Sequence, residues 1–391
     1  MLRYFTAGES HGEALIAFLS GLPAGIKIDQ GFLDRELWRR QQGYGRGGRM
    51  KIESDRVHII SGVRNGLTIG SPISIQIENK DWKNWQESLP VNEGDPTKHK
   101  RVGSPRPGHA DLAGALKYNF PEARYVLERA SARESAARVA IGGLAKLFLR
   151  ELGIEVLSHV IAVGSVSLSE EVPWEKIRSL SDREEVLLNC ADAQVEQGMK
   201  EEVDKILKSG DSLGGVFEVV AHHVPPGLGT YAQWDERLDA LLAAAVMSLQ
   251  AVKAVEIGAG ISAAVSRGSA VHDEIGYSAP RESFTAFSRT RNNAGGIEGG
   301  VSNGQEIRIR GYLKPISTLR RPLQSVDFAT REPVKAAYER SDVCVVPAAG
   351  VAAEAMVALT LTRCALEKFG GDSMLETCRN FNGYLEQLKK Y

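Results

Sequence analysis

Arginines and glycines are concentrated between Trp38 and Lys51, where the sequence reads Trp-Arg-Arg-Gln-Gln-Gly-Tyr-Gly-Arg-Gly-Gly-Arg-Met-Lys. Glycine lets a backbone approach a ligand closely, and the arginine side chain donates hydrogen bonds in a rigid fork that matches phosphate and carboxylate oxygens. We therefore expect a loop that wraps an anion. Its available cations are Arg39, Arg40, Arg46, Arg49 and Lys51.

Two histidines lie in segments whose backbones are shaped by glycine or proline. His11 is enclosed in Gly8-Glu-Ser-His-Gly12, where a simple turn and an exposed acid or base are equally good interpretations. His109 follows Arg106-Pro-Gly at the end of a long irregular segment, which favours a functional role. Because histidine titrates near neutral pH, both residues are candidates for proton transfer to a leaving group.

Further cations and hydroxyls occur where anions are commonly bound. Arg129, Ser131 and Arg133 bracket a predicted helix start, whose free N–H groups favour anions; a capped helix with solvated arginines is the alternative. Lys314-Pro-Ile-Ser-Thr318 offers a cation and two hydroxyls, and Arg340-Ser-Asp342 adds an aspartate. Many arginines with few carboxylates suit a substrate with several negative charges. The residues alone predict a lyase or transferase that acts on a multiply anionic small molecule.

Composition and the remaining motifs argue against several other classes of protein. A formal net charge of -1 over 391 residues disfavours an RNA-binding protein, for which Arg46-Gly-Gly48 would be a single short RGG segment. Gly258–Ala263 matches the dinucleotide fingerprint of NAD(P)-dependent dehydrogenases, but we expect a long helix before it and a β-like run after it, which is the wrong order. His222 and His223 have no third ligand nearby, so we expect no metal site.

Cysteine usage and hydropathy indicate the compartment. The four cysteines show no C-x-x-C spacing, which favours a reduced intracellular protein. The N-terminal segment is polar too early for a signal peptide, and we expect no apolar run of membrane-spanning length. We therefore predict a cytoplasmic protein that binds neither membrane nor nucleic acid.

The elements that position these residues form a predicted α+β fold. Ile73, Ile75 and Ile77 alternate with polar residues, the pattern of a half-buried strand. Short connections such as Asn65-Gly66 imply antiparallel pairing. Strands are expected within residues 2–28, 56–79 and 154–166, and helices over 31–42, 134–152, 232–256 and 347–369, two of them opened by capping boxes at Ser131–Glu134 and Thr230–Gln233.

Helices that recur beside extended segments suggest an internally repeated α+β unit. No Pro/Ser-rich linker separates the halves, so we expect one compact body over residues 1–391. Residues 167–210 are polar and charged, and we expect short helices at the periphery there.

Six blocks of this sequence, in this order, resemble the signature motifs of the chorismate synthase family. They are Gly8-Glu-Ser-His-Gly12, Gly43-Tyr-Gly-Arg-Gly-Gly-Arg-Met50, Ser104-Pro-Arg-Pro-Gly-His-Ala-Asp111, Arg129-Ala-Ser-Ala-Arg-Glu134, Asn292-Asn-Ala-Gly-Gly-Ile-Glu-Gly-Gly-Val-Ser-Asn-Gly304 and Arg340-Ser-Asp342. The resemblance covers essentially the whole chain. Ser135 stands where a threonine is common in the family, which keeps a hydroxyl there.

This resemblance implies the last step of the shikimate pathway, a 1,4-trans elimination of phosphate from 5-enolpyruvylshikimate 3-phosphate to give chorismate. It implies reduced FMN (FMNH2) as cofactor without net redox change, helices sandwiched between antiparallel β-sheets, and a homotetramer. No segment has the pattern of an added reductase domain, so we expect reduced flavin to come from outside.

The resemblance also assigns roles to individual residues. His11 would protonate the departing phosphate, His109 would donate a proton to the flavin, and Asp342 would relay the proton from flavin N5. Cofactor contacts would come from Arg129, Ala130, Ser131, Gln250, Ala251, Gly299, Lys314, Pro315, Ile316, Ser317, Thr318 and Arg340. Substrate or NADP would be bound by Arg40, Arg46, Arg49, Arg106 and Arg133, with Arg340 shared between substrate and cofactor.

Overall fold

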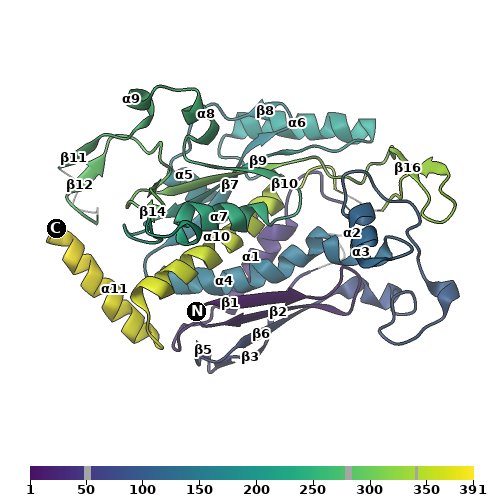
Figure 1. Cartoon of the computed structure of the whole chain (residues 1–391), viewed down its shortest axis with the longest axis horizontal. Coiled ribbons are helices and arrows are strands. Elements are labelled where there is room, and N and C mark those ends of the chain that lie inside the picture. The colour runs from purple at the N-terminus through teal and green to yellow at the C-terminus, as the bar shows by residue number, and fades with distance from the viewer. Residues whose placement is uncertain (48–53, 278–283, 340–341) are drawn as a thin grey trace.

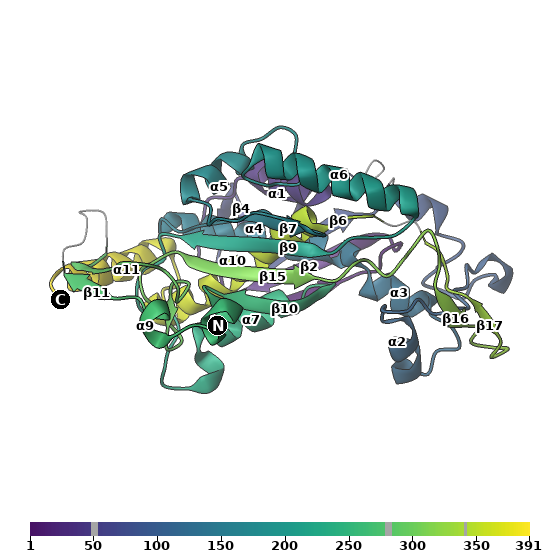
Figure 2. The same cartoon turned by 90° about the horizontal axis from the view of Figure 1, so that it is seen from above.

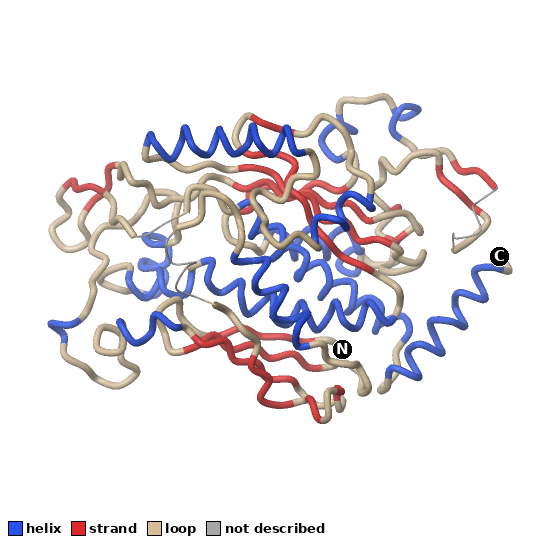
Figure 3. Tube along the Cα trace, turned by 180° about the vertical axis from the view of Figure 1, so that it is seen from behind, coloured by secondary structure: helices blue, strands red, loops and turns tan. Residues whose placement is uncertain are grey.

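The structure, a computed structural model, describes residues 1–47, 54–277, 284–339 and 342–391. Two antiparallel sheets lie on opposite sides of a layer of long helices (Figures 1 and 2). The tube in Figure 3 shows the same arrangement from behind, with blue helices between red strands. The α+β class is therefore confirmed. Arg49, Lys51 and Arg340 lie outside the described residues.

The first sheet contains four strands in the order β1-β2-β6-β3, all antiparallel. One face packs on the helices, and the side chains of β6 that point to it, Ile73, Ile75 and Ile77, are almost fully buried. The predicted Asn65-Gly66 turn joins a short hairpin, and both residues have positive φ. The bounds are β1 (Arg3–Ala7), β2 (Ala14–Ser20), β3 (His58–Ser61), β4 (Val63–Arg64), β5 (Leu67–Thr68) and β6 (Ile73–Glu78).

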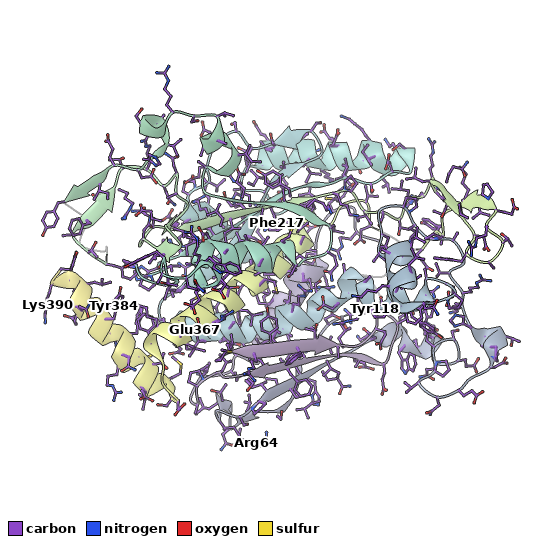
Figure 4. The ribbon with its side chains drawn as sticks, in the orientation of Figure 1. Arg64, Tyr118, Phe217, Glu367, Tyr384 and Lys390 are labelled. Carbon is purple, nitrogen blue, oxygen red and sulfur yellow. The ribbon has the colours of Figure 1, made fainter. Side chains whose placement is uncertain are left out.

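The second sheet contains five strands in the order β10-β15-β9-β7-β8, and every described pairing is antiparallel. Phe217 of β9 is fully buried in the middle of the molecule (Figure 4). A Cβ at Gly311 of the neighbouring strand would lie 2.2 Å from its ring, so glycine is required there. The bounds are β7 (Glu155–Val163), β8 (Val166–Ser167), β9 (Gly215–His222), β10 (Val252–Ile257) and β15 (Ile307–Leu313).

The helical layer is built on α1 (Gln30–Gln41), α4 (Ser135–Glu151), α7 (Leu238–Met247) and α10 (Val346–Phe369). Helix α4 packs on β2 and β6 of the first sheet, and α10 packs on β7 and β9 of the second. The two helices touch closely, because a Cβ added to Gly142 would lie 2.2 Å from the Cβ of Ala355. As predicted, Asp29 caps α1, Pro347 opens α10 and Gly370 ends it.

Helix α10 corrects one expectation from the sequence. It is the one helix within the described ranges that is long and apolar enough, by length and composition, to cross a membrane. Of its most apolar window, 78% is buried inside the protein. There the helix packs against α4, α7 and strands β7 and β9 of the second sheet. A run of this kind is typical of a core helix, which is apolar all round because neighbours surround it.

The remaining helices, strands and turns lie around the two sheets and the helical layer. They are α2 (Asp111–Tyr118), α3 (Arg124–Ala130), α5 (Trp174–Ser181), α6 (Ala193–Ser209), α8 (Gly260–Ala264), α9 (Gly268–Val271), α11 (Met374–Lys389), β11 (Ile275–Tyr277), β12 (Phe287–Arg289), β13 (Ile297–Glu298), β14 (Val301–Ser302), β16 (Gln324–Val326), β17 (Pro333–Lys335), and the 3₁₀ turns η2 (Lys80–Asn84), η3 (Pro96–Lys98), η4 (Ala132–Glu134) and η5 (Trp234–Glu236). The prediction of short peripheral helices over 167–210 is wrong for α6, which has 17 residues and buries Met199 and Val203 in the main core.

The helix predicted over 232–256 is wrong in its bounds. It is replaced by η5, then α7, and then strand β10. Ala251 interrupts the helical path with φ at 71°, and β-branched Val252, Val255 and Ile257 suit a strand better than a helix. Buried residues of α7 lie on one side of the helix, so it is not buried all round as predicted.

The context predicted for the dinucleotide fingerprint at Gly258–Ala263 is also wrong. Strand β10 precedes it and α8 follows it, which is the order that the motif needs. However, β10 is an edge strand that pairs antiparallel with β15, and α8 has only five residues. An NAD-binding unit is built on parallel strands joined by a crossover helix, so the pairing of β10 is the argument that remains against this function.

The predicted capping boxes form only in part. Ser131 accepts a hydrogen bond from the backbone N–H of Arg133, at 3.2 Å, in a 3₁₀ turn that precedes α4. The Glu134 carboxylate does not return to Ser131, because it accepts hydrogen bonds from Thr6 and Arg138. Thr230 likewise accepts from the N–H of Ala232 in a turn before η5, and no helix begins there.

Candidate active site

A cavity of about 600 Å³ opens where the C-terminal end of α1, the junction of α3 with η4, the loop after β15 and the segment before α10 meet. Ligand pockets in proteins commonly measure about 300–1,000 Å³. The cavity collects most of the predicted site residues from segments far apart in the sequence. Those that line it are His11, Arg40, Arg46, Arg106, His109, Ala130, Ser131, Arg133, Gln250, Ala251, Lys314, Pro315, Ile316, Ser317, Thr318 and Asp342.

His11 is held on two sides at the edge of this cavity. Its Nδ1 lies 2.9 and 3.0 Å from the two carboxylate oxygens of Glu128, whose Oε2 also accepts the backbone N–H of His11 at 2.8 Å. The ring stacks on Trp85, with centroids 4.0 Å apart. Burial raises the pKa of the Glu128 carboxyl, but the hydrogen bonds from His11 and the charge of Arg124 outweigh it and hold that pKa below its usual range.

His109 belongs to a second cluster, built on the buried carboxylate of Asp111. Nδ1 of His109 lies 2.5 Å from Oδ1 of Asp111, and Nε and Nη2 of Arg106 donate to the same carboxylate at 2.8 and 3.0 Å. Burial raises the pKa of Asp111, yet the hydrogen bonds from His109 and Arg106 overcome this and lower it strongly. Nη1 of Arg106 reaches Thr318 at 2.9 Å, which joins this cluster to the loop after β15.

Arg40 and Arg133 form a cationic wall with one shared counterion. Nη1 of Arg133 donates to both oxygens of Asp55, at 2.7 and 2.6 Å, while Nη1 of Arg40 lies 3.5 Å from Oδ2. Both arginines are almost fully buried. The pKa of Arg40 is lowered to about 9, mainly by burial and also by the neighbouring cations Arg133 and Arg46, while the charges of Asp55 and Asp342 act against this. An anionic ligand in the cavity would favour the charged form of Arg40.

Arg46 and Asp342 form an ion pair in the lining of the cavity. Nε of Arg46 lies 3.2 Å from Oδ2 of Asp342, and the backbone N–H of Gly47 donates to Oδ1 at 2.5 Å. The backbone N–H of Val343 also donates to the carbonyl of Gly45 at 2.8 Å. The described part of the arginine-glycine loop is thus tied to the segment that leads into α10.

The loop after β15 and the residues before β10 shape the less polar part of the cavity. Ala251 has φ at 71°, a conformation that costs a non-glycine residue free energy and is concentrated at ligand sites. Its carbonyl accepts the N–H of Lys314, and the Lys314 ammonium donates to the carbonyl of Gly108. Apolar side chains here come from Leu127, Ala130, Ala251, Pro315, Ile316 and Val345. This part of the cavity therefore combines apolar side chains with the cation of Lys314.

Three predicted ligand-binding residues lie elsewhere in the described chain. The Arg129 guanidinium donates to the carbonyl of Thr6 in edge strand β1 and to that of Gly8 just after it. Gly299 lies in the turn between β13 and β14, outside the cavity. Arg39 corrects the interpretation of the arginine loop, because its guanidinium binds the buried carboxylates of Glu36 and Glu354 at 2.7–2.8 Å and not the cavity.

Sequence reasoning missed the carboxylates that hold the site together. No role was predicted for Glu128, Asp55 or Glu339, and Asp111 appeared only within a motif. No local signal marks Glu128 or Asp55, since their partners lie 117 and 78 residues away. Asp111, two residues after His109, could have been found from spacing alone. Within the ranges that the structure covers, no group of three or more metal-ligating side chains is found.

Comparisons with known proteins agree on one family. A family model described as chorismate synthase matches residues 2–366. Relatives named chorismate synthase are 72% identical in Koribacter versatilis (strain Ellin345) and 67% identical in Acidobacterium capsulatum, each over 393 residues and the whole of both chains. A solved structure titled "Crystal Structure of Chorismate Synthase" matches with a TM-score of 0.79 and 39% identity, over 100% of this chain and 99% of that one. The chain therefore belongs to the chorismate synthase family.

Proposed function

We propose that the cavity binds 5-enolpyruvylshikimate 3-phosphate against reduced FMN and that the residues around it carry out the 1,4-trans elimination of phosphate. Membership of the family makes the chain a lyase of the last step of the shikimate pathway. The observation that carries the proposal for the site is that His11, His109 and Asp342 line one cavity together with Arg40, Arg46, Arg106, Arg133 and Lys314. The substrate has two carboxylates and a phosphate, so this excess of cations suits its charge.

His11 would act as the acid for the leaving phosphate. Glu128 binds its Nδ1, so Nε2 is the ring nitrogen that can give a proton to a ligand. Arg40 and Arg133 would bind anionic groups of the substrate, and their shared counterion Asp55 keeps both guanidinium groups in place. Protonation of a leaving group by a positioned imidazole contributes typically about 10²–10⁴-fold to a rate.

The apolar wall around Ala251 and the loop Lys314–Thr318 would hold the flavin ring, with Gln250, Ala130 and Ser131 alongside. When bound there, reduced flavin would supply electron density to the substrate and a basic nitrogen for the C6 proton. His109 would hold a proton on the flavin side of the cavity, oriented by Asp111. Asp342 would receive the proton that is released, and its contact with Arg46 stabilises the carboxylate between turnovers.

An anaerobic assay of phosphate release tests this assignment. The wild-type protein should release phosphate from the substrate only when reduced FMN is present. His11→Ala and His109→Ala should still bind substrate but turn over far more slowly. Unchanged turnover in either variant would remove that residue's role, and phosphate release with oxidised FMN under strict anaerobiosis would contradict the mechanism. A parallel run with NADPH and oxidised FMN tests whether flavin must be reduced elsewhere, as we expect.

We also propose a homotetramer, located in the cytoplasm, whose chain is one domain over residues 1–391. Exposed aromatic side chains on the outer face of the first sheet, such as Phe5 at 72% exposure, support association. One main core cluster takes side chains from both sheets, which supports a single domain. The first sheet has the strand order β1-β2-β6-β3, and the second sheet, without its edge strand β8, has the matching order β7-β9-β15-β10. In both sets of four strands, helices follow the second and the fourth strand along the chain, which supports an internal repeat. Light scattering after size-exclusion chromatography tests the tetramer, and a monomeric mass would contradict it.

A further inference from the structure

Glu128 stands out among the charged residues next to the cavity. Its side chain is 2% exposed, and the mechanism above gives it no step of its own. Both carboxylate oxygens lie within 3.0 Å of Nδ1 of His11, and one of them also accepts that residue's backbone N–H. The same loop is fixed again by the backbone N–H of Ser10, which donates to the carbonyl of Glu128. Side chain and backbone of one glutamate thus hold the histidine segment.

One face of the His11 ring is covered by an indole. Trp85 stacks at 4.0 Å with an interplanar angle of 27°. Its own orientation is fixed by a hydrogen bond of 3.2 Å from Nε1 to the buried carboxylate of Asp81. The imidazole is therefore held by a carboxylate at its edge and by an aromatic ring on its face.

Two cations lie close to this cluster. Arg124 donates to Glu128 at 3.2 Å and lies over Trp85, as does the Lys100 ammonium at 3.9 Å from the ring centroid. Both oxygens of Glu128 lie at hydrogen-bond distance from Nδ1 of His11, so Glu128 favours the tautomer that carries its proton on Nδ1.

We propose that Glu128 is a positioning residue that fixes His11 as the Nδ1–H tautomer, with Nε2 as the atom that exchanges a proton with the leaving phosphate. The inference rests on the proposed function in so far as His11 is the acid. A carboxylate that accepts from Nδ1–H leaves Nε2 for the substrate and stabilises the ring when both nitrogens carry protons. This arrangement matches the task of an acid that must be charged before reaction and neutral after it.

A purely structural role is the competing explanation, because Glu128 also binds Arg124. That arginine keeps two further acceptors, the Lys100 carbonyl at 2.7 Å and the Glu339 carboxylate at 2.9 Å. Replacing Glu128 by glutamine therefore removes a charge without leaving Arg124 unpaired. Glu122 provides a matched control, since it is also buried, holds a histidine (His99, 2.8 Å) and accepts backbone N–H groups, but lies outside the cavity lining.

Glu128→Gln and Glu122→Gln should be compared in three measurements. The first is the ¹⁵N NMR spectrum of selectively labelled histidines in the ligand-free protein, which reports the tautomer of His11 without any turnover. The second is the measurement of kcat and KM for phosphate release with reduced FMN. The third is a double-mutant cycle with His11→Asn, because a residue that acts through His11 has no further effect once His11 is gone.

For Glu128→Gln we expect loss of the fixed Nδ1–H signature and a fall in kcat on the order of 100-fold, as for other carboxylates that orient imidazoles. KM should change little. Glu122→Gln should change none of these.

Additive effects in the double-mutant cycle, or an unchanged His11 spectrum in Glu128→Gln, would overturn the proposal. If the wild-type protein released no phosphate while the His11 spectrum still depended on Glu128, the proposed function would fail and the positioning of His11 would stand.

Discussion

Glu36→Gln removes one carboxylate from a buried cluster of four charges beside the active site. Glu36 and Glu354 face Arg39 and Lys146, and all four residues are at most 6% exposed. Arg39 donates to both carboxylates at 2.7–2.8 Å, and the Lys146 ammonium donates to both as well. With glutamine at position 36, two buried cations would share one counterion, the situation in which broken buried pairs are most costly.

The pKa of Glu36 gives the size of the effect. Burial would raise this pKa, but Lys146 and Arg39 lower it from 4.5 to about 2. A pKa lowered by that amount corresponds to roughly 3 kcal/mol of stabilisation of the folded state. Because the folded-state value lies below the unfolded one, this stabilisation is fully present above about pH 4.5 and is lost as the pH falls toward about 2.

Urea unfolding of the wild type and Glu36→Gln, followed by circular dichroism, tests this value. Near about pH 7 the variant should unfold with a free energy lower by roughly 3 kcal/mol, and the difference should shrink as the pH is lowered through about 4. Glu175→Gln on the exposed side of α5 is the control and should match the wild type at every pH. A difference below about 1 kcal/mol near neutral pH, or one that grows on acidification, would refute the reasoning.

Three shorter predictions follow from other contacts. Asp111→Asn should lower kcat about 10- to 100-fold with little change in KM, because His109 loses the carboxylate that orients it; an unchanged kcat in the phosphate-release assay would contradict this. Ala251→Gly should raise the free energy of unfolding of the ligand-free protein by about 1 kcal/mol, since glycine tolerates the positive φ found there; a lower thermal midpoint is the opposing result. Gly142→Ala should destabilise by about 1–3 kcal/mol because the added methyl group meets Ala355 on the facing helix; a wild-type urea midpoint would show that the helices can separate without cost.

Local patterns were sufficient for the parts of the fold that depend on neighbours in sequence. The two-residue period of Ile73–Ile77, the cap at Asp29 and the Pro347–Gly370 limits of α10 were all predicted correctly. The prediction for segment 232–256 failed at its ends, because the alanine- and leucine-rich middle forms α7 whereas the β-branched residues Val252, Val255 and Ile257 lie in strand β10. The break at Ala251 depends on a backbone conformation that no residue type signals.

The sequence was sufficient to predict most residues of the candidate site but not the contacts between them. Motifs located the histidines and most cations, since glycine, proline and helix starts lie next to them. Their counterions could not be predicted, because Glu354 pairs with Arg39 across 315 positions and Asp55 with Arg133 across 78. Arg39 and Arg40 show the limit most directly. They are neighbours in sequence, yet successive helical residues point about 100° apart, so one side chain enters the core and the other lines the cavity.

The wall formed by Arg40, Arg133 and their shared counterion Asp55 has a consequence for the protein when it is free of ligand. Like charges are crowded there before any substrate arrives, so folding must bring mutually repelling guanidinium groups together. An anion that binds between them relieves the repulsion only in the folded state. By mass action this adds RT ln(1 + [L]/Kd) to the free energy of unfolding, about 2.7 kcal/mol when the ligand is at 100 times its Kd. The abundance of substrate in the cell would then set how long each enzyme molecule resists unfolding and proteolysis, and a starved pathway would lose this enzyme sooner than a supplied one.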